Sequence, residues 1–189
     1  MLIKNNILGK VADEDIDNGT IVIPDDVTEI DSCAFEDCIS LISIKIPDNV
    51  TKINYKAFKN CENLQSIKIP DGVKYIGSSA FCNCESLKSI NIPDNITLIG
   101  VFAFKNCKNL KSIKIPNSVK HIGTGAFENC TKLPYHFENG FQRRSIFYKS
   151  MTICQLLCFP LFLKISVTFF KGTILLRMHT TQIMNQRHD

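Results

Sequence analysis

Hydrophobic and polar positions follow one 23-residue pattern through most of the chain. Its skeleton is Leu-x-x-Ile-x-Ile-Pro-x-x-Val-x-x-Ile-Gly-x-x-Ala-Phe-x-x-Cys, and residues 64–87 are one copy of it. A period sustained five times indicates a stacked array, in which each repeat buries its apolar side chains against its neighbours. The step holds without error for the prolines, phenylalanines and cysteines at Pro24, Pro47, Pro70, Pro93, Pro116, Phe35, Phe58, Phe81, Phe104, Phe127, Cys38, Cys61, Cys84, Cys107 and Cys130.

Each repeat contains an Ile-x-Ile alternation, which is the pattern of a strand that buries one face. The isoleucines of each pair are expected to point inward, and the residues before and between them outward. The proline that follows cannot donate to a β-ladder, so each strand should end at the same place. The inward pairs are Ile44 and Ile46, Ile67 and Ile69, Ile90 and Ile92, and Ile113 and Ile115.

Turn-forming residues divide the rest of each repeat. An aspartate or asparagine follows the proline, and such pairs start turns through a preset φ and side-chain bonds to nearby amides. A second apolar pair comes next, and after it a residue of the types that most readily take positive φ. We expect left-handed backbone at this position, which holds Asp31, Asn54, Gly77, Gly100 and Gly123. The Ala-Phe-x-x-Cys quarter is too short for a free-standing helix and predicts one helical or 3₁₀ turn.

These elements predict a β-rich repeat solenoid of about five rungs, with parallel strands stacked about 4.8 Å apart. The pattern resembles the BspA-like leucine-rich repeat family, whose unit carries the same Ile-Pro, Ile-Gly and Ala-Phe-x-x-Cys marks, over residues 20–133. The resemblance implies a curved solenoid of the leucine-rich-repeat type. It also implies a role in adhesion or protein–protein binding, in bacterial surface proteins and in microbial eukaryotes, and no catalytic residues.

The repeat marks divide the chain into three parts. Residues 1–19 lack the marks and predict an N-terminal cap with a strand or hairpin over the first rung, because a terminal repeat must shield its open face. The acidic residues from Asp13 to Asp17 are interpreted as a solvated connection. Residues 20–133 hold the five repeats. The array ends at Leu133, since the next repeat would need isoleucines where the chain has His136 and Glu138.

Residues 134–189 form an atypical hydrophobic and basic tail. All the arginines of the chain lie here, and the segment Met151–Phe170 carries a single charge, Lys164. Three interpretations stay open for this part of the chain. It is a membrane-spanning helix, for which about 20 mainly apolar residues suffice; or a hydrophobic C-terminal cap with strands on the last rung; or out-of-frame coding sequence.

The distribution of charge and the cysteine content indicate which classes of partner and which cell compartment to expect. The net charge of +4 belongs to the tail, since residues 20–133 hold thirteen lysines and twelve acids, so the array has no nucleic-acid-binding character. Five of the nine cysteines share one core position and are expected to be buried thiols. The N-terminal residues lack the apolar run of a secretory signal. A reducing cytosol is therefore the default compartment, with the cell surface or a membrane as the alternative.

The sequence holds no recurring catalytic or metal-binding arrangement. The four histidines are scattered, without a Ser/His/Asp or Cys/His pattern, so the chain is not expected to be an enzyme. The pairs Cys33 and Cys38, and Cys82 and Cys84, each lack the second pair that a structural zinc site needs, so no metal or cofactor is expected. The aspartate column after the prolines lacks the glycine-rich nonapeptide of calcium-binding β-rolls, and turn capping accounts for it.

Outward strand positions are the ones free to carry function. One interpretation of them is solubility and protection against association of sheets. The other is a weakly cationic strip for an acidic protein or glycan surface. The residues stack in two columns, with Ser43, Ser66, Ser89 and Ser112 in one and Lys45, Lys68, Asn91 and Lys114 in the other.

We therefore predict a non-catalytic protein–protein interaction module of the adhesion type, which binds through the outward face of the repeat sheet. Its partner is an unidentified protein or glycan, any membrane contact would come from the tail, and the chain is expected to be a monomer. The alternative is a membrane-tethered surface adhesin anchored by Met151–Phe170.

Overall fold

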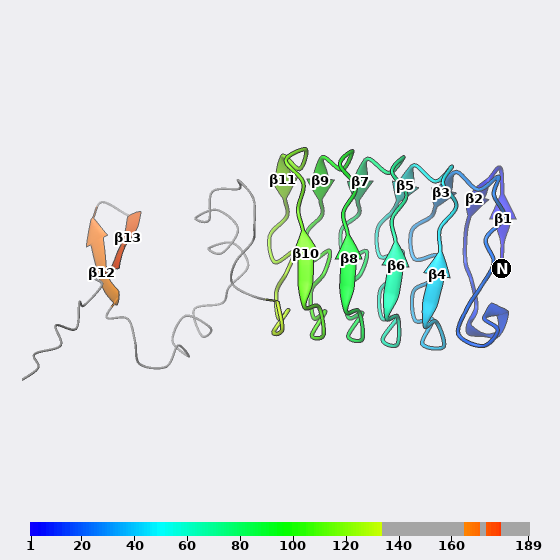
Figure 1. Cartoon of the computed structure of the whole chain (residues 1–189), viewed down its shortest axis with the longest axis horizontal. Coiled ribbons are helices and arrows are strands. Elements are labelled where there is room, and N and C mark those ends of the chain that lie inside the picture. The colour runs from blue at the N-terminus through cyan, green and yellow to red at the C-terminus, as the bar shows by residue number, and fades with distance from the viewer. Residues whose placement is uncertain (134–164, 171–172, 179–189) are drawn as a thin grey trace, which may run out of the picture. The chain divides into compact units, whose positions relative to one another are not determined.

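Two β-sheets run along the repeat array, and the computed structural model describes residues 1–133, 165–170 and 173–178. Figure 1 shows the four-stranded sheet nearest the viewer and the seven-stranded sheet behind it. The seven-stranded sheet contains, in order, β1 (Ile3–Lys4), β2 (Ile7–Leu8), β3 (Glu29–Ile30), β5 (Lys52–Ile53), β7 (Tyr75–Ile76), β9 (Leu98–Ile99) and β11 (His121–Ile122). The four-stranded sheet contains β4 (Ser43–Lys45), β6 (Ser66–Lys68), β8 (Ser89–Asn91) and β10 (Ser112–Lys114).

The strands of successive repeats pair in parallel and in register. Ile44 lies opposite Ile67, and Ile67 opposite Ile90, so every pair joins residues one repeat apart. We number the rungs 1 to 5, as residues 18–40, 41–63, 64–86, 87–109 and 110–132. The predicted solenoid of stacked rungs is confirmed.

At each inward position of the repeat, the apolar side chains of successive rungs form a column. Together these columns make a continuous hydrophobic core. The paired isoleucines of rungs 2 to 4 are buried as predicted. The phenylalanines stack along the axis, with ring centroids 4.8 Å apart from Phe35 to Phe58 and 5.4 Å apart from Phe104 to Phe127. These separations are equal to or slightly larger than the spacing of neighbouring β-strands, so one ring fits each rung.

The cysteine column lies beside the phenylalanines and is hydrogen-bonded to them. The thiol of Cys61 donates to the carbonyl oxygen of Phe35 in the rung before (3.1 Å), and Cys84 donates to Phe58 in the same way (3.1 Å). The prediction of buried thiols is confirmed for Cys38, Cys61, Cys84 and Cys107. Burial raises the pKa of the Cys38 thiol to about 11, and it raises the pKa of Cys61 and Cys84 further.

We expect the buried thiols to resist alkylation in the folded chain. A thiol reacts as its thiolate, and the raised pKa values of Cys61 and Cys84 leave almost no thiolate at pH 8. Iodoacetamide at pH 8, followed by peptide mass spectrometry, should label these two at least about a hundredfold more slowly than in urea, since exposed thiols have a pKa of about 8.5. Equal rates in buffer and in urea would contradict the buried column.

Positive φ occurs at two positions of each rung, and neither is the predicted one. The first comprises Cys33, Lys56, Ser79, Phe102 and Gly125, and the second Asp37, Asn60, Asn83, Asn106 and Asn129. The prediction for the position of Gly77, Gly100 and Gly123 is wrong, because glycine serves another purpose there. A Cβ on Gly77 would lie 2.5 Å from the backbone carbonyl of Asn54, so the bare Cα lets the two rungs approach.

The second positive-φ position carries an asparagine ladder that the sequence analysis missed. The side-chain amide of Asn83 donates to the Asn60 side-chain oxygen (2.7 Å), and Asn106 donates to Asn83 (2.7 Å). Asn129 and Asn60 continue the ladder in the same sense, and Asp37 accepts at its first rung (2.6 Å). Asparagine tolerates left-handed backbone, so one residue type serves both the bend and the ladder. The sequence signal for this ladder is an Asp or Asn immediately before every repeat cysteine.

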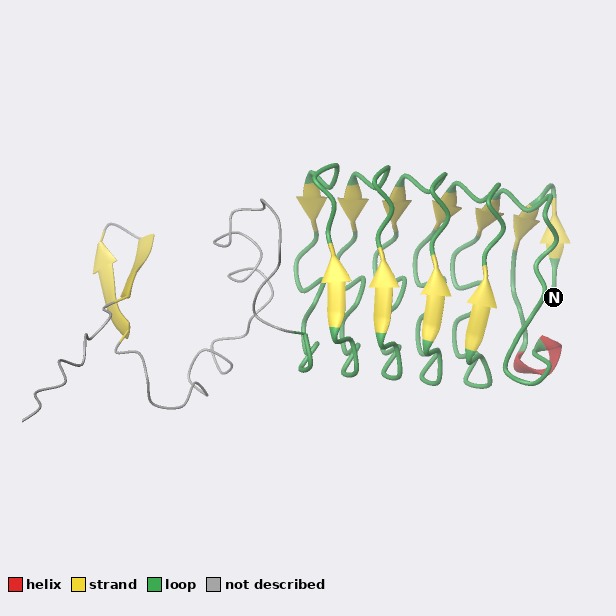
Figure 2. Ribbon diagram, in the orientation of Figure 1, coloured by secondary structure: helices red, strands yellow, loops and turns green. Residues whose placement is uncertain are grey.

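The Ala-Phe-x-x-Cys quarter forms consecutive turns rather than a helix (Figure 2). In rung 2, Ala57 N–H donates to the Asn54 carbonyl and Cys61 N–H to the Phe58 carbonyl, each closing a turn of four residues. The neighbouring N–H groups point instead to the next rung, as Phe58 does to Ala80 (2.8 Å). This alternation satisfies the backbone between rungs, which a helix could not do.

A hairpin covers the N-terminal end of the array. β1 and β2 are antiparallel, and β2 pairs in parallel with β3. The 3₁₀ turn η1 (Asp13–Asp15) follows, and it is not simply a solvated connection. The carboxylate of Asp13 accepts from the backbone N–H and the hydroxyl of Ser40, at 2.9 and 2.6 Å, and so holds the cap to rung 1.

The tail contains one described element, an antiparallel hairpin of β12 (Ile165–Phe170) and β13 (Thr173–Met178). The chain divides into two compact units, Met1–Met151 and Thr152–Asp189, and each is described by itself. The described end of the segment Met151–Phe170 is thus a strand and not a membrane helix. Residues 151–164, on which the three interpretations of the tail mainly rest, lie outside the described residues. Within the described ranges, no helix has the length and apolar character needed to cross a membrane.

Candidate functional site

The register of the four-stranded sheet brings the predicted outward residues together. Ser43 lies opposite Ser66, and Lys45 opposite Lys68. Ser89 and Asn91 continue these two columns, and Ser112 and Lys114 end them. Every lysine of the column is exposed, while the isoleucines between the columns point inward. We call this surface the four-stranded face.

A further column, which includes two lysines, borders the serine column and was missed by the sequence analysis. The residue before each strand is Gln65, Lys88 or Lys111 in rungs 3 to 5, and all three are exposed. Lys88 donates to the side-chain oxygen of Gln65 (2.9 Å), so the column is continuous across these rungs. The repeat period contained this signal, because each residue immediately precedes the serine column.

The lysines of the four-stranded face have no acidic partner within the described array, a property that they share with Lys74, Lys120 and Lys132. Within residues 1–133, none of Lys45, Lys68, Lys88, Lys111 and Lys114 forms an ion pair. By contrast, four other lysines of the array pair closely with a glutamate of an adjacent rung, namely Lys52 with Glu29 (2.9 Å), Lys59 with Glu36 (2.9 Å), Lys105 with Glu128 (3.1 Å) and Lys108 with Glu85 (2.6 Å).

Hydrogen bonds from lysine favour the charged form of two of these glutamates, Glu29 and Glu36. The bond from Lys52 holds the pKa of Glu29 below its ordinary value, and the bond from Lys59 does the same for Glu36. The acids of the pairs are therefore neutralised locally. The lysines of the four-stranded face form no such pairs within residues 1–133, so no ion pair there neutralises their positive charge.

Exposed aspartates border the four-stranded face where the chain leaves each strand. Asp48, Asp71 and Asp94 follow the prolines, and their carboxylates accept no hydrogen bond within the described array. The predicted capping by these side chains is therefore wrong. The backbone closes the turn, as in the bond from Val50 N–H to the Pro47 carbonyl (3.1 Å). The aspartates remain as an acidic margin.

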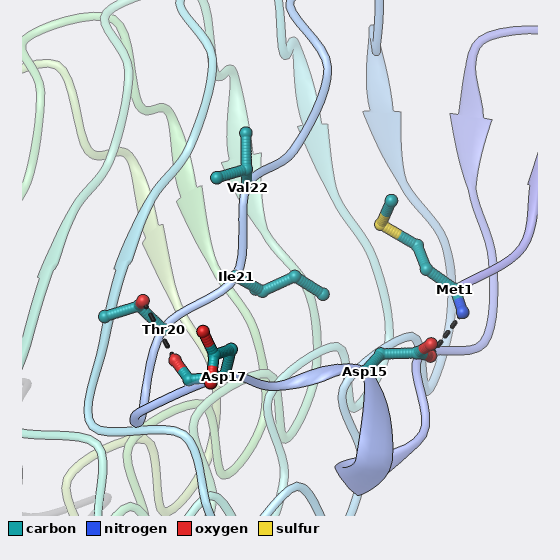
Figure 3. Close-up of a pocket in the computed structure, with 6 residues that line it drawn as sticks. All are labelled: Met1, Asp15, Asp17, Thr20, Ile21 and Val22. Carbon is teal, nitrogen blue, oxygen red and sulfur yellow. Dashed lines mark hydrogen bonds and ion pairs between the residues drawn. The ribbon is translucent and has the colours of Figure 1, made fainter.

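A shallow pocket lies at the N-terminal end of the array (Figure 3). Thr20, Ile21 and Val22 line it along one chain segment, and Met1, Asp15 and Asp17 complete it. The amino group of Met1 donates to the Asp15 carboxylate, which keeps the pKa of Asp15 below its ordinary value. The Thr20 hydroxyl donates to the Asp17 carbonyl (3.1 Å). These polar groups bond to one another, and the remaining lining is apolar.

No catalytic or metal-binding arrangement appears on the described surface. Among the described residues, no group of three or more His, Cys, Asp or Glu side chains could hold a metal ion. His121 is exposed on β11. Cys33 has a pKa raised by burial, which disfavours the thiolate that a nucleophile needs.

Comparison with known proteins identifies the repeat. A family model described as the BspA type leucine rich repeat region matches residues 13–134 in six copies, one more than the five proline-marked repeats. The comparison with curated proteins found no match.

Solved structures with the same fold come from bacteria. The T. pallidum leucine rich repeat protein is 34% identical, with a TM-score of 0.63 over 67% of this chain and 60% of that one. A leucine rich cell surface protein from Faecalibacterium prausnitzii A2-165 is 37% identical, with a TM-score of 0.67 over 77% of this chain and 38% of that one. The chain thus spans less than two thirds of either protein. The match over 13–134, together with the stacked rungs, shows that the chain belongs to the BspA-type leucine-rich repeat family.

Proposed function

We propose that the chain is a non-catalytic binding module of the adhesion type, which holds an acidic partner protein against the four-stranded face. The observation that carries the proposal is the segregation of charge. Five exposed lysines without ion pairs gather on one face, although residues 20–133 hold nearly equal numbers of lysines and acids. A surface of one sign steers a partner of the opposite sign and fixes its position.

Solubility alone does not account for this arrangement. Two like charges about 5 Å apart in water repel by about 0.8 kcal/mol, so a lysine column has a cost that scattered charges would avoid. The array has acids on neighbouring rungs, and it pairs them with lysines elsewhere. Placing the same acids opposite the lysine column would relieve the repulsion, and the sequence does not do so.

The family supports the proposed role and setting. The F. prausnitzii protein is described as a cell surface protein, which supports a surface setting for this module. A membrane tether through Met151–Phe170 stays a prediction, and carbonate extraction of the full chain tests it, since release into the soluble fraction would exclude the tether.

We expect replacement of Lys45, Lys68 and Lys114 by serine to weaken partner capture about tenfold or more, because three interfacial charges are lost together. Immobilised full chain would be exposed to cell-surface extract, and the captured proteins would be quantified by mass spectrometry. Capture should also fall as salt rises, since the Debye length shrinks to about 3 Å at 1 M. The thermal midpoint should stay unchanged or rise, because repulsion in the column is relieved.

The matched control replaces Lys52, Lys74 and Lys120 by serine. These residues lie in or beside strands of the seven-stranded sheet. Their replacement removes as many positive charges as the replacement of Lys45, Lys68 and Lys114. Capture should survive in this variant. If the two triple variants lose capture equally, net charge and not the four-stranded face attracts the partner, and the proposal fails.

A further inference from the structure

Three outward positions change from polar to apolar at the N-terminal end of the four-stranded face. Val22 is 84% exposed, Ile39 52% and Ile42 42%. We call these three residues the apolar end. In later rungs the position of Val22 holds Lys45, Lys68, Asn91 and Lys114, that of Ile39 holds Glu62, Glu85 and Lys108, and that of Ile42 holds Gln65, Lys88 and Lys111.

The repeat makes this departure informative. Every rung has the same inward positions to fill, so the core does not require an apolar residue at any of these outward ones. A single exposed aliphatic residue needs no explanation, but three exposed ones near one end of a candidate binding face, at positions where later rungs carry polar residues, are of the kind found at interaction sites.

The fold also holds the apolar end in place. Gly19 has φ +77°, and a Cβ there would lie 2.6 Å from Cδ1 of Ile42. The Ile42 side chain therefore rests against bare backbone, and its own N–H donates to the Gly19 carbonyl (2.8 Å). A larger residue at 19 would displace Ile42. One flank of the patch is thus built on a close packing contact.

Charge changes along the four-stranded face from its apolar end onward. Val22 and Ile21 share the N-terminal pocket with Asp15 and Asp17 (Figure 3), so the pocket is apolar with acidic walls. One rung further on, Lys45 takes the position of Val22, and lysines continue to Lys114. Because Asp15 is paired with the amino group of Met1, Asp17 is the carboxylate that would repel an acidic group at the first end, whereas the lysines would attract one from rung 2 onward.

We propose that the four-stranded face binds one extended acidic segment of a partner protein with a fixed polarity: an apolar residue of the segment seats on Val22, Ile39 and Ile42, and its acidic residues follow the lysines toward β10. The inference rests on the proposed function of this face, and it adds the chemistry and the direction of the ligand.

The width of the four-stranded face is suited to a single extended peptide chain. Three residues of a strand span about 10 Å, which is enough for one extended segment. Asp71 and its equivalents border the face on one side and would repel a broad acidic surface, whereas a narrow segment avoids them. Lys45 and Lys114 are three rungs apart, about 14 Å, which corresponds to about four residues of extended peptide.

Synthetic fluorescent peptides test the proposal on the full chain. The first probe joins two leucines to four glutamates, made in both chain orders, and the second contains the four glutamates alone. Fluorescence anisotropy at low salt would measure binding to the wild type and to two double variants. The apolar-end variant, Val22→Asn with Ile42→Gln, replaces two of the three residues of the apolar end by the residue types that the array itself carries at Asn91 and Gln65. Leu98→Gln with Val101→Asn makes the matched changes at exposed positions of the seven-stranded sheet side.

The apolar-end variant should bind the leucine-containing probe about tenfold more weakly, as expected for the loss of partial burial of two aliphatic side chains. It should bind the glutamate probe as the wild type does, and the matched control variant should leave both affinities unchanged. If the leucine-containing probe binds the apolar-end variant at wild-type strength while Lys45, Lys68 and Lys114 still prove necessary, the polarity is wrong and the binding face stands. If neither the lysine variant nor the apolar-end variant weakens either probe, both proposals fail. Absence of any probe binding to the wild type overturns the assigned ligand.

Discussion

Replacement of Gly100 by alanine is expected to lower the free energy of unfolding by about 3 kcal/mol, at the upper end of the usual cost of overpacking. The added Cβ would lie 2.5 Å from the Ser78 backbone nitrogen and 2.7 Å from the carbonyl carbon of Gly77. Both contacts are with backbone of the preceding rung, which cannot rotate away as a side chain could. The rungs must therefore separate locally, and the strand pairing of β7 with β9 weakens with them.

Urea unfolding followed by circular dichroism measures this effect, and Gly9→Ala is its matched control. At Gly9 the nearest atom to an added Cβ is 3.5 Å away, an ordinary contact, so the change should stay within about 0.5 kcal/mol. The first two rungs carry Asp31 and Asn54 at the position of Gly100, so the requirement applies to rungs 3 to 5. Equal stability of the two alanine variants would show that the rungs are not in close backbone contact.

Phe81→Ala is expected to destabilise the chain by about 3–5 kcal/mol, the usual cost of removing a fully buried aromatic ring. Phe81 is completely buried in rung 3 and stacks between Phe58 and Phe104, with both centroid separations 5.3 Å. Removing the ring leaves a cavity in the middle of the column. The rungs on either side cannot close it, because the strands of the two sheets fix their spacing.

The comparison for Phe81→Ala is Tyr55→Ala. Tyr55 is aromatic and lies in rung 2, but it is 47% exposed, so its loss should cost less than about 1 kcal/mol. Differential scanning calorimetry of both variants would measure the difference. A loss at Phe81 no larger than at Tyr55 would exclude a continuous aromatic core.

The repeat period predicted the fold because equal spacing leaves little freedom of register. Once Ile44, Ile67 and Ile90 must all point inward, the strands can pair only one repeat apart, and the structure confirms this pairing. The bends were harder to predict, because glycine has two uses. Gly77 suggested positive φ, but its role is close backbone approach, and Asn83 takes the positive φ instead. Sequence alone does not reveal how near the next rung lies.

The candidate site was predicted in part. The serine and lysine columns followed from the outward strand positions, and the register brings them together. Lys88 and Lys111 were missed because they precede the strands, and their exposure depends on how the chain enters the sheet. The apolar end was missed for a related reason. Val22 and Ile42 read as ordinary apolar residues until the structure shows that they point into solvent.

Lysine acetylation footprinting is the most direct test of the four-stranded face as the binding surface. The full chain would be treated with an acetylating reagent with and without the captured partner, and modification at each lysine would be measured by mass spectrometry. The account predicts that the partner protects Lys45, Lys68, Lys88, Lys111 and Lys114 and leaves Lys52, Lys74 and Lys120 unchanged. Protection of the second group with continued modification of the first would contradict it.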